Sequence, residues 1–150
     1  MKPAAVNKQA YFNYEILETL EAGIALLGSE VKSVREGRVS MKDSYADIQD
    51  GELFLFQCHI SPYEQANRLN HDPLRPRKLL LHRREIKRLT GKVRERGLTL
   101  VPTKIFFSER GLVKVELALA KGKKQYEKRA VIKERDRQRE ARAALKNARR

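Results

Sequence analysis

Hydrophobic and polar residues alternate most clearly between residues 113 and 119 (VKVELAL). Successive side chains of a strand point to opposite faces, so the valines and leucines share one face while Lys114 and Glu116 share the other. The segment KIFF (104–107) precedes this strand, and Glu109-Arg110-Gly111 lies between the two. The pattern predicts an antiparallel hairpin in which Lys114 projects into solvent.

A second hairpin is indicated by Asp50-Gly51, because this dipeptide favours the two-residue turns that connect neighbouring strands. Short hydrophobic segments flank it, ADI before and LFLF after. Near the start of the chain, residues 14–17 and 24–27 predict two more strands, with a turn at Glu21-Ala22-Gly23.

The segment KLLLH (78–82) predicts another strand. Its alternation places Leu80 away from the core, on the face opposite Leu79 and Leu81. A long loop with three prolines, residues 61–77, comes before it. Loops of this length in compact domains are usually functional or disordered.

Two helices are also predicted. Residues 82–96 have helical periodicity and end at Gly97, which is a favourable residue for closing a helix. The hydrophobic side of this helix consists of Ile86, Leu89 and Val93. A shorter helix would begin with Ser29 as its N-cap and end at Gly37.

Short antiparallel strands with small helices indicate a mainly β fold. An antiparallel barrel of OB-like type agrees with this pattern, because closure removes exposed strand edges. Periodicity alone leaves the strand order open. The predicted body spans residues 1–120, and residues 121–150 form a separate C-terminal tail.

The charge supports this division. The chain has 33 Lys and Arg against 19 Asp and Glu, a net charge of +14. The tail contains 13 basic and four acidic residues, a net charge of +9 in 30 positions, so the body is only mildly basic. Such an excess indicates a polyanionic partner, either nucleic acid or an anionic membrane surface.

The tail has no Gly or Pro after Gly122, so nothing in it breaks a helix. Five cations follow one another at steps of four and three residues and would form one stripe along such a helix: Arg135, Arg139, Arg142, Lys146 and Arg149. Repulsion along the stripe and the small number of large apolar residues predict a tail that is disordered alone and helical on RNA.

Candidate chemistry is sparse. The chain has three scattered histidines and one cysteine, which build no common zinc spacing, and it lacks a nucleotide-binding glycine loop. Neighbouring residues of a strand point in opposite directions, so Cys58-His59 predicts a buried thiol and a rim imidazole. His71-Asp72 indicates a structural hydrogen bond, and capping is the ordinary role for Glu21 and Glu30. We therefore expect no enzyme activity, no metal, no cofactor and no small-molecule substrate.

A membrane role is disfavoured by the same residues. Interfacial helices need a broad apolar face, whereas the tail offers mainly Leu145 as a large anchor. No run of about 20 apolar residues is present, and MKPAAVNKQA lacks the apolar stretch of a signal peptide. We expect a cytoplasmic protein.

Five segments, in this order, resemble the tmRNA-binding SmpB family: EAGIALLGSEVKS (21–33), CHISPYE (58–64), NHDPLRPRKLLLHRREI (70–86), GKVRERGLTLVP (91–102) and VKVELALAKGKKQYEKR (113–129). The resemblance covers about residues 7–150. It implies an OB-like barrel with three short helices. It also implies binding of the tRNA-like domain of tmRNA near its elbow, and delivery of tmRNA to stalled ribosomes in trans-translation.

The same resemblance implies RNA contacts at Glu21, Leu80 and Lys114, and Asn7 matches a family asparagine. A lysine suits a phosphate, an exposed leucine suits a base or ribose, and a carboxylate suits base donors or 2′-hydroxyls. The family usually has Arg-His where this chain has Tyr11-Phe12. Aromatic stacking on RNA and simple packing both remain open there, and we favour packing.

In the tail, Gly122 matches the family's hinge and Tyr126 its stacking ring. The segment Glu127-Lys128-Arg129 stands where relatives have Asp-Lys-Arg. The resemblance implies that Tyr126 stacks on small-subunit rRNA at the decoding centre and that the following helix occupies the empty mRNA channel.

Three alternatives belong to other classes. An RNA-modifying or RNA-cleaving enzyme would need a base, nucleophile or metal site that the sequence does not offer. A membrane-surface protein would need a more apolar tail. A ribosomal or general RNA-binding OB-like protein with a basic extension agrees with the composition, and only the family motifs argue against it.

Overall fold

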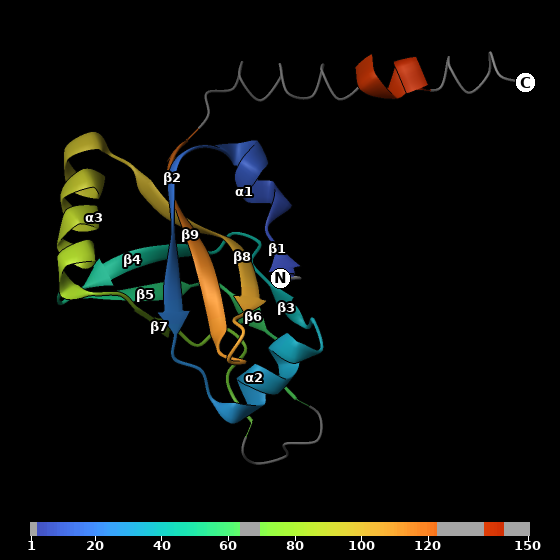
Figure 1. Cartoon of the computed structure of the whole chain (residues 1–150), viewed down its shortest axis with the longest axis vertical. Helices are drawn as coiled ribbons and strands as arrows, with labels where there is room; N and C mark the ends of the chain where they lie inside the picture. The colour runs from blue at the N-terminus through green and yellow to red at the C-terminus, as the bar shows by residue number, and fades with distance from the viewer. Residues whose placement is uncertain (1–2, 64–69, 123–136, 143–150) are drawn as a thin grey trace, which may run out of the picture.

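The computed structural model describes residues 3–63, 70–122 and 137–142 (Figure 1). In chain order the elements are β1 (Pro3–Val6), α1 (Lys8–Asn13), β2 (Tyr14–Ile24), α2 (Gly28–Arg35), β3 (Val39–Ser40), β4 (Tyr45–Gln49), β5 (Glu52–Phe56), β6 (His59–Ile60), β7 (Arg77–Leu80), α3 (Arg83–Arg96), β8 (Thr99–Phe107) and β9 (Val113–Gly122). The predominance of strands over short helices confirms the predicted fold class.

The main sheet closes on itself. Its strand order is β1-β8-β4-β5-β7-β2-β9, and β8 also pairs with β9, so six strands form a ring to which β1 is added. All pairings are antiparallel. β8 can hold three neighbours because β4 contacts it at Leu100 while β1 contacts it at residues 104–106. The predicted antiparallel barrel is therefore present.

Both predicted hairpins are confirmed. Asp50 and Gly51 have φ of 53° and 78°, the left-handed geometry that the β4–β5 turn requires. The β8–β9 turn contains Gly111 with φ of 79°. In each case the local turn residue that the sequence offers is the one that the backbone uses.

The predicted turn at Glu21-Ala22-Gly23 is wrong. β2 continues without interruption from Tyr14 to Ile24, and all three residues pair with β9. Gly23 is not used for a left-handed backbone. A glycine is required at this position because Leu80 of the neighbouring strand β7 approaches closely.

The barrel interior is filled by alternating side chains, with Leu55, Ile60, Val115 and Leu117 fully buried. Leu89 of α3 reaches the same core and is also fully buried. α3 begins at Arg83 and ends before Gly97, whose φ is 62°, so the predicted long helix is confirmed. In Figure 1 it lies beside the barrel, next to β4 and β5.

The short helix α2 begins earlier than predicted. Its N-cap is Leu27, not Ser29, and the backbone N–H of Leu27 donates to Glu30 Oε1 at 2.8 Å. Ser29 instead lies inside the helix, where its hydroxyl meets His71 Nδ1 at 2.8 Å. The hydrogen bond of the cap therefore comes from Glu30, which confirms that a glutamate caps this helix.

Glu30 is fully buried together with Arg77. Arg75 and Arg77 approach its two carboxylate oxygens at 2.5 and 2.6 Å, and Arg77 also donates to the backbone oxygen of Cys58. Burial alone would raise the pKa of Glu30, but the hydrogen bonds from Arg75 and Leu27 and the charge of Arg77 outweigh burial and lower that pKa. This cluster joins α2 to the segment before β7.

Cys58 is buried and His59 is exposed, as predicted. Burial raises the pKa of the Cys58 thiol to about 11, so this thiol is inert at neutral pH. His71 is also buried, and its Nε2 lies 2.9 Å from the carbonyl of Ile60, to which it donates. Its neighbour Asp72 accepts from the backbone N–H of Leu74 instead. The predicted structural hydrogen bonding of His71 and Asp72 is confirmed.

Within the predicted tail, residues 121–150, the structure describes residues 121–122 and 137–142. Lys121 and Gly122 still belong to β9 and pair with β2, and residues 137–142 are helical, with Arg139 and Arg142 exposed. The other predicted contacts lie outside the described residues: Tyr126, Glu127, Lys128, Arg129, Arg135, Lys146 and Arg149. Among the described residues, no helix is long and apolar enough to cross a membrane.

Candidate nucleic-acid interface

Three strands bring the predicted contacts on the body together. Gly23 of β2 pairs with Leu80 of β7 on one side and with Lys114 of β9 on the other. Glu21 lies two residues earlier on β2 and therefore on the same face of the strand. Residues that are 93 positions apart in the sequence thus form one surface, which we call the Gly23 surface (Glu21, Gly23, Leu80 and Lys114).

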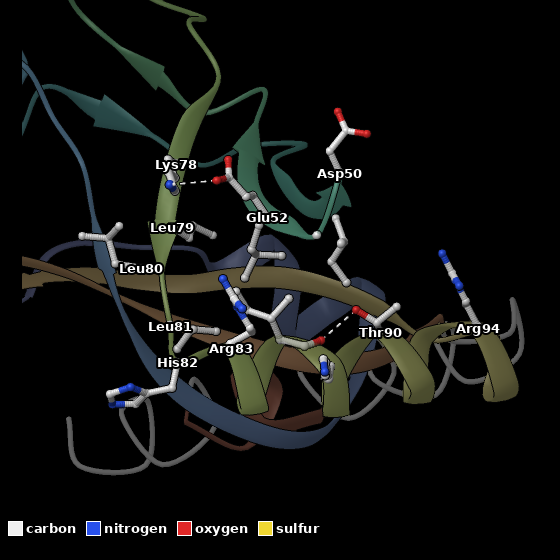
Figure 2. Close-up of a pocket in the computed structure, with 15 residues that line it drawn as sticks. Asp50, Glu52, Lys78, Leu79, Leu80, Leu81, His82, Arg83, Thr90 and Arg94 are labelled. Atoms are coloured by element: carbon white, nitrogen blue, oxygen red, sulfur yellow. Dashed lines mark hydrogen bonds and ion pairs between the residues drawn. The ribbon is translucent and has the colours of Figure 1, made fainter.

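Leu80 is the most exposed hydrophobic side chain of this surface. It is 51% exposed, whereas Leu79 beside it is 1% exposed. Figure 2 shows the two side chains leaving β7 in opposite directions. The predicted alternation is confirmed, and it leaves a large apolar side chain without cover on the outside of the barrel.

Gly23 makes room for Leu80. A Cβ atom at residue 23 would lie 3.2 Å from the Cβ of Leu80 and 3.4 Å from its Cδ1, closer than side chains usually pack. The absence of a side chain at residue 23 therefore leaves room for Leu80 on this face of β2. The sequence did contain a signal for this, because a glycine inside a strand pattern often marks a close approach of another group.

The charges on this surface have few internal partners. Glu21 pairs across the sheet with Glu116, and two carboxylates directly opposite each other repel. Glu116 is compensated, since it accepts from Thr103 at 2.6 Å and lies 3.9 Å from Lys104. Within the described part of the chain, neither Glu21 nor Lys114 forms an ion pair within 4.0 Å.

The Gly23 surface forms a shallow depression. Leu81, His82 and Glu85, at the junction of β7 and α3, complete its lining. The result is a half-exposed apolar side chain beside one cation, Lys114, and two carboxylates, Glu21 and Glu85, none of which forms an ion pair within the described part of the chain. This combination suits RNA: the lysine can bind a phosphate, the leucine can pack against a base or ribose, and the carboxylate can accept from base amines or 2′-hydroxyls.

Asn7 lies elsewhere and is buried. Its amide nitrogen donates to the carbonyl oxygens of Pro102 and Met41 at 2.9 and 3.4 Å, and its Oδ1 accepts from the N–H of Ala10 at 3.2 Å. The side chain thus caps α1 and fastens it to β8. An RNA contact by Asn7 remains a prediction that rests on the resemblance alone.

Tyr11 and Phe12 are on α1, the same short helix. Tyr11 is 49% exposed and Phe12 is half-buried. Neither joins the Gly23 surface.

Among the described residues, no group of three or more His, Cys, Asp and Glu side chains is placed to hold a metal ion.

Known proteins are similar to this chain over most of its length. A family model described as "SmpB protein" matches residues 4–147. The SsrA-binding protein of Symbiobacterium thermophilum is 60% identical over 146 residues, covering 97% of this chain and 92% of that protein. The SsrA-binding protein of Moorella thermoacetica is 61% identical over 146 residues, covering 97% and 94% of the two chains.

A solved structure is also similar. Its description reads "tmRNA-SmpB: a journey to the center of the bacterial ribosome". The two chains share 57% sequence identity and a TM-score of 0.68, and the match covers 81% of this chain and 85% of the other.

Proposed function

The chain belongs to the SmpB protein family, and we propose on this basis that it binds the tRNA-like domain of tmRNA and delivers it to stalled ribosomes for trans-translation. Its relatives are named SsrA-binding proteins, and the description of the similar structure names tmRNA-SmpB and the bacterial ribosome. The proposed activity is binding and delivery in the cytoplasm, without a catalytic step.

The Gly23 surface is the proposed contact with the elbow of the tRNA-like domain. The observation that carries this assignment is Leu80, which is half-exposed and held over Gly23 beside the unpaired Lys114. A lone exposed leucine is ordinary on a protein surface. Here the neighbouring strand has a glycine where any larger residue would crowd the leucine, so Leu80 is held with an apolar face toward solvent.

The test is binding of the isolated tRNA-like domain by the full chain carrying Leu80→Ala, Lys114→Ala or Glu21→Ala. We expect each variant to bind more weakly while its thermal unfolding is almost unchanged, because surface substitutions usually alter stability by no more than about 0.5 kcal/mol. Lys114→Ala should reduce the slope of log K against log salt by about 1. Leu74→Ala, another exposed leucine, is the matched control. Unchanged binding in all three variants would contradict the site.

The tail is proposed to act after binding. The hinge at Gly122 would let it reach the decoding centre of the small subunit. Tyr126 would stack there on rRNA, and Glu127, Lys128 and Arg129 would lie beside it. The helical stripe Arg135, Arg139, Arg142, Lys146 and Arg149 would follow the empty mRNA channel. Arg139 and Arg142, the described members of the stripe, are exposed on a helical segment and are therefore available to phosphates.

Two changes separate this role from binding to tmRNA. A chain truncated after Gly122, which keeps β9 intact, should bind the tRNA-like domain but fail to support tagging on stalled ribosomes. Tyr126→Ala should reduce tagging more than Tyr126→His, since an imidazole keeps a stacking face and stacking is worth about 1–3 kcal/mol. Normal tagging by the truncated chain would exclude the decoding-centre role.

A further inference from the structure

A groove lies next to the Gly23 surface, between α3 on one side and β7 with the β4–β5 hairpin on the other (Figure 2). Its volume is about 890 Å³, and Leu80, Leu81 and His82 line both the groove and the depression described above. The two sites therefore meet at the junction of β7 and α3, and an extended ligand on one of them can continue into the other.

The α3 wall of the groove is basic. Arg83, Lys87 and Arg94 lie at steps of four and seven residues, so they share one side of the helix. Across the groove, Lys78 is neutralised by Glu52 at 3.2 Å, which leaves Asp50 as the one unpaired carboxylate of the lining. Within the described part of the chain, Asp50 is not within 4.0 Å of any of the three cations.

Two cations on another side of α3 are compensated. Arg88 and Lys92 bind the two carboxylate oxygens of Glu18 at 2.7 and 2.9 Å. Of two pairs of cations spaced four residues apart on this helix, Arg88 and Lys92 have a partner within the described part of the protein. The other pair, Arg83 and Lys87, stands four residues apart and repels without such a partner.

Helix electrostatics does not explain the second pair. A cation near the last turn, such as Arg94, is favoured by the negative end of the helix dipole. Arg83 is the first residue of α3, at the positive end, where a cation is disfavoured. An anion bound along the groove would compensate both this effect and the repulsion between Arg83 and Lys87.

We propose that Arg83 and Lys87 bind phosphates of the same tmRNA strand that contacts Leu80, so that the RNA backbone runs from the Gly23 surface along α3. This assignment rests on the proposed function, because it extends the tmRNA contact. The partner is a phosphodiester backbone, because three cations against one carboxylate make the groove attractive to a polyanion. Since the groove is continuous with Leu80, that polyanion is the tmRNA proposed to contact Leu80.

The experiment compares two double variants of the full chain, Arg83→Gln/Lys87→Gln and the control Arg88→Gln/Lys92→Gln. Both remove two positive charges from the same helix, and glutamine keeps a similar helix propensity. The slope of log K against log salt is measured for the tRNA-like domain. The first variant should lower the slope by about 1.4 to 1.8, which corresponds to two phosphate contacts, and the control should change it by less than about 0.5.

A second readout locates the RNA directly. Cys58 is buried, so a Thr90→Cys chain carries one accessible thiol, on the α3 wall of the groove. An iron chelate attached there should cleave the bound tRNA-like domain at one short segment, whereas the unsubstituted chain treated in the same way should cleave nothing. Cleavage at a defined segment supports the assignment, and its absence in a complex that still forms contradicts it.

Each result has one meaning. If Leu80→Ala and Lys114→Ala bind normally, the proposed function of the Gly23 surface fails. If those variants bind weakly but Arg83→Gln/Lys87→Gln has the slope of the unsubstituted chain, only the groove assignment is overturned. The assignment is also overturned if both double variants lower the slope equally, since net charge alone would explain that, or if the first variant loses ribosome binding while its affinity for tmRNA is unchanged.

Discussion

Two regions of this protein both contain carboxylates and cations, but among the described residues the charges are paired in one region and unpaired in the other. Where α2 meets the segment before β7, Glu30 is fully buried between Arg75 and Arg77. On the outer face of β2 and β9, Glu21 and Lys114 have no ion-pair partner within the described part of the chain. The first region satisfies its charges internally and holds the fold, and the second is the proposed contact with RNA.

The segment 70–82 belongs to both regions. Arg75 and Arg77 point inward to Glu30, and three residues after Arg77 the strand presents Leu80 to solvent. The buried ion pairs therefore fix the beginning of β7, and the pairing of Gly23 with Leu80 fixes its end. Leu80, the proposed recognition residue, is therefore positioned by a buried ion pair at the start of the same strand.

The largest expected effect is the removal of the anchor. Glu30→Ala leaves Arg77 charged and fully buried without a carboxylate, which typically costs about 3–5 kcal/mol of stability. Glu52→Ala is the matched control, because Glu52 pairs with Lys78 on the surface, where an ion pair contributes about 0–1 kcal/mol. Denaturant unfolding measures both. Equal losses in the two variants would show that burial does not distinguish the regions.

The sequence allowed some of this comparison to be predicted, because parts of it are local. Asp50-Gly51 specifies its turn chemically, and alternation within five residues placed Leu80 outside. Glu30 and Arg77 are 47 residues apart, so no local pattern joins them, and each charge taken alone would be expected at the surface. The sequence predicts a turn at Gly23, because the neighbour that requires a glycine there, Leu80, comes from a strand that is distant in the sequence.

A smaller effect should separate recognition from folding at Gly23. In Gly23→Ala the new methyl group would lie 3.2 Å from the Cβ of Leu80, so the leucine must move by a few tenths of an ångström. The φ of Gly23 is not in the left-handed region, so an alanine backbone fits. We expect weaker binding of the tRNA-like domain, with stability changed by less than about 1 kcal/mol.

The control for this change is Gly91→Ala on α3, where an added Cβ meets nothing within 4 Å. That variant should bind normally, and it should be slightly more stable, since alanine is favoured over glycine within a helix by about 1 kcal/mol. If Gly23→Ala binds as tightly as Gly91→Ala, the close approach of Leu80 has no part in recognition.

The smallest expected effect concerns Glu18, whose environment is intermediate between those of Glu30 and Glu21. Hydrogen bonds from Lys92 and Arg88 lower its pKa from the ordinary value of 4.5, although the carboxylate stays about one-third exposed. A lowered pKa in the folded state means that the contribution to stability is complete above about pH 4.5 and is lost as the pH falls through the folded value. An ion pair so close to solvent contributes about 0–1 kcal/mol.

The difference in unfolding free energy between the unsubstituted chain and Glu18→Gln should therefore be small at pH 7, decrease below pH 4.5 and weaken in high salt. A difference that stays constant from pH 7 to pH 3 would show that Glu18 stabilises the fold by packing instead of by charge, unlike Glu30.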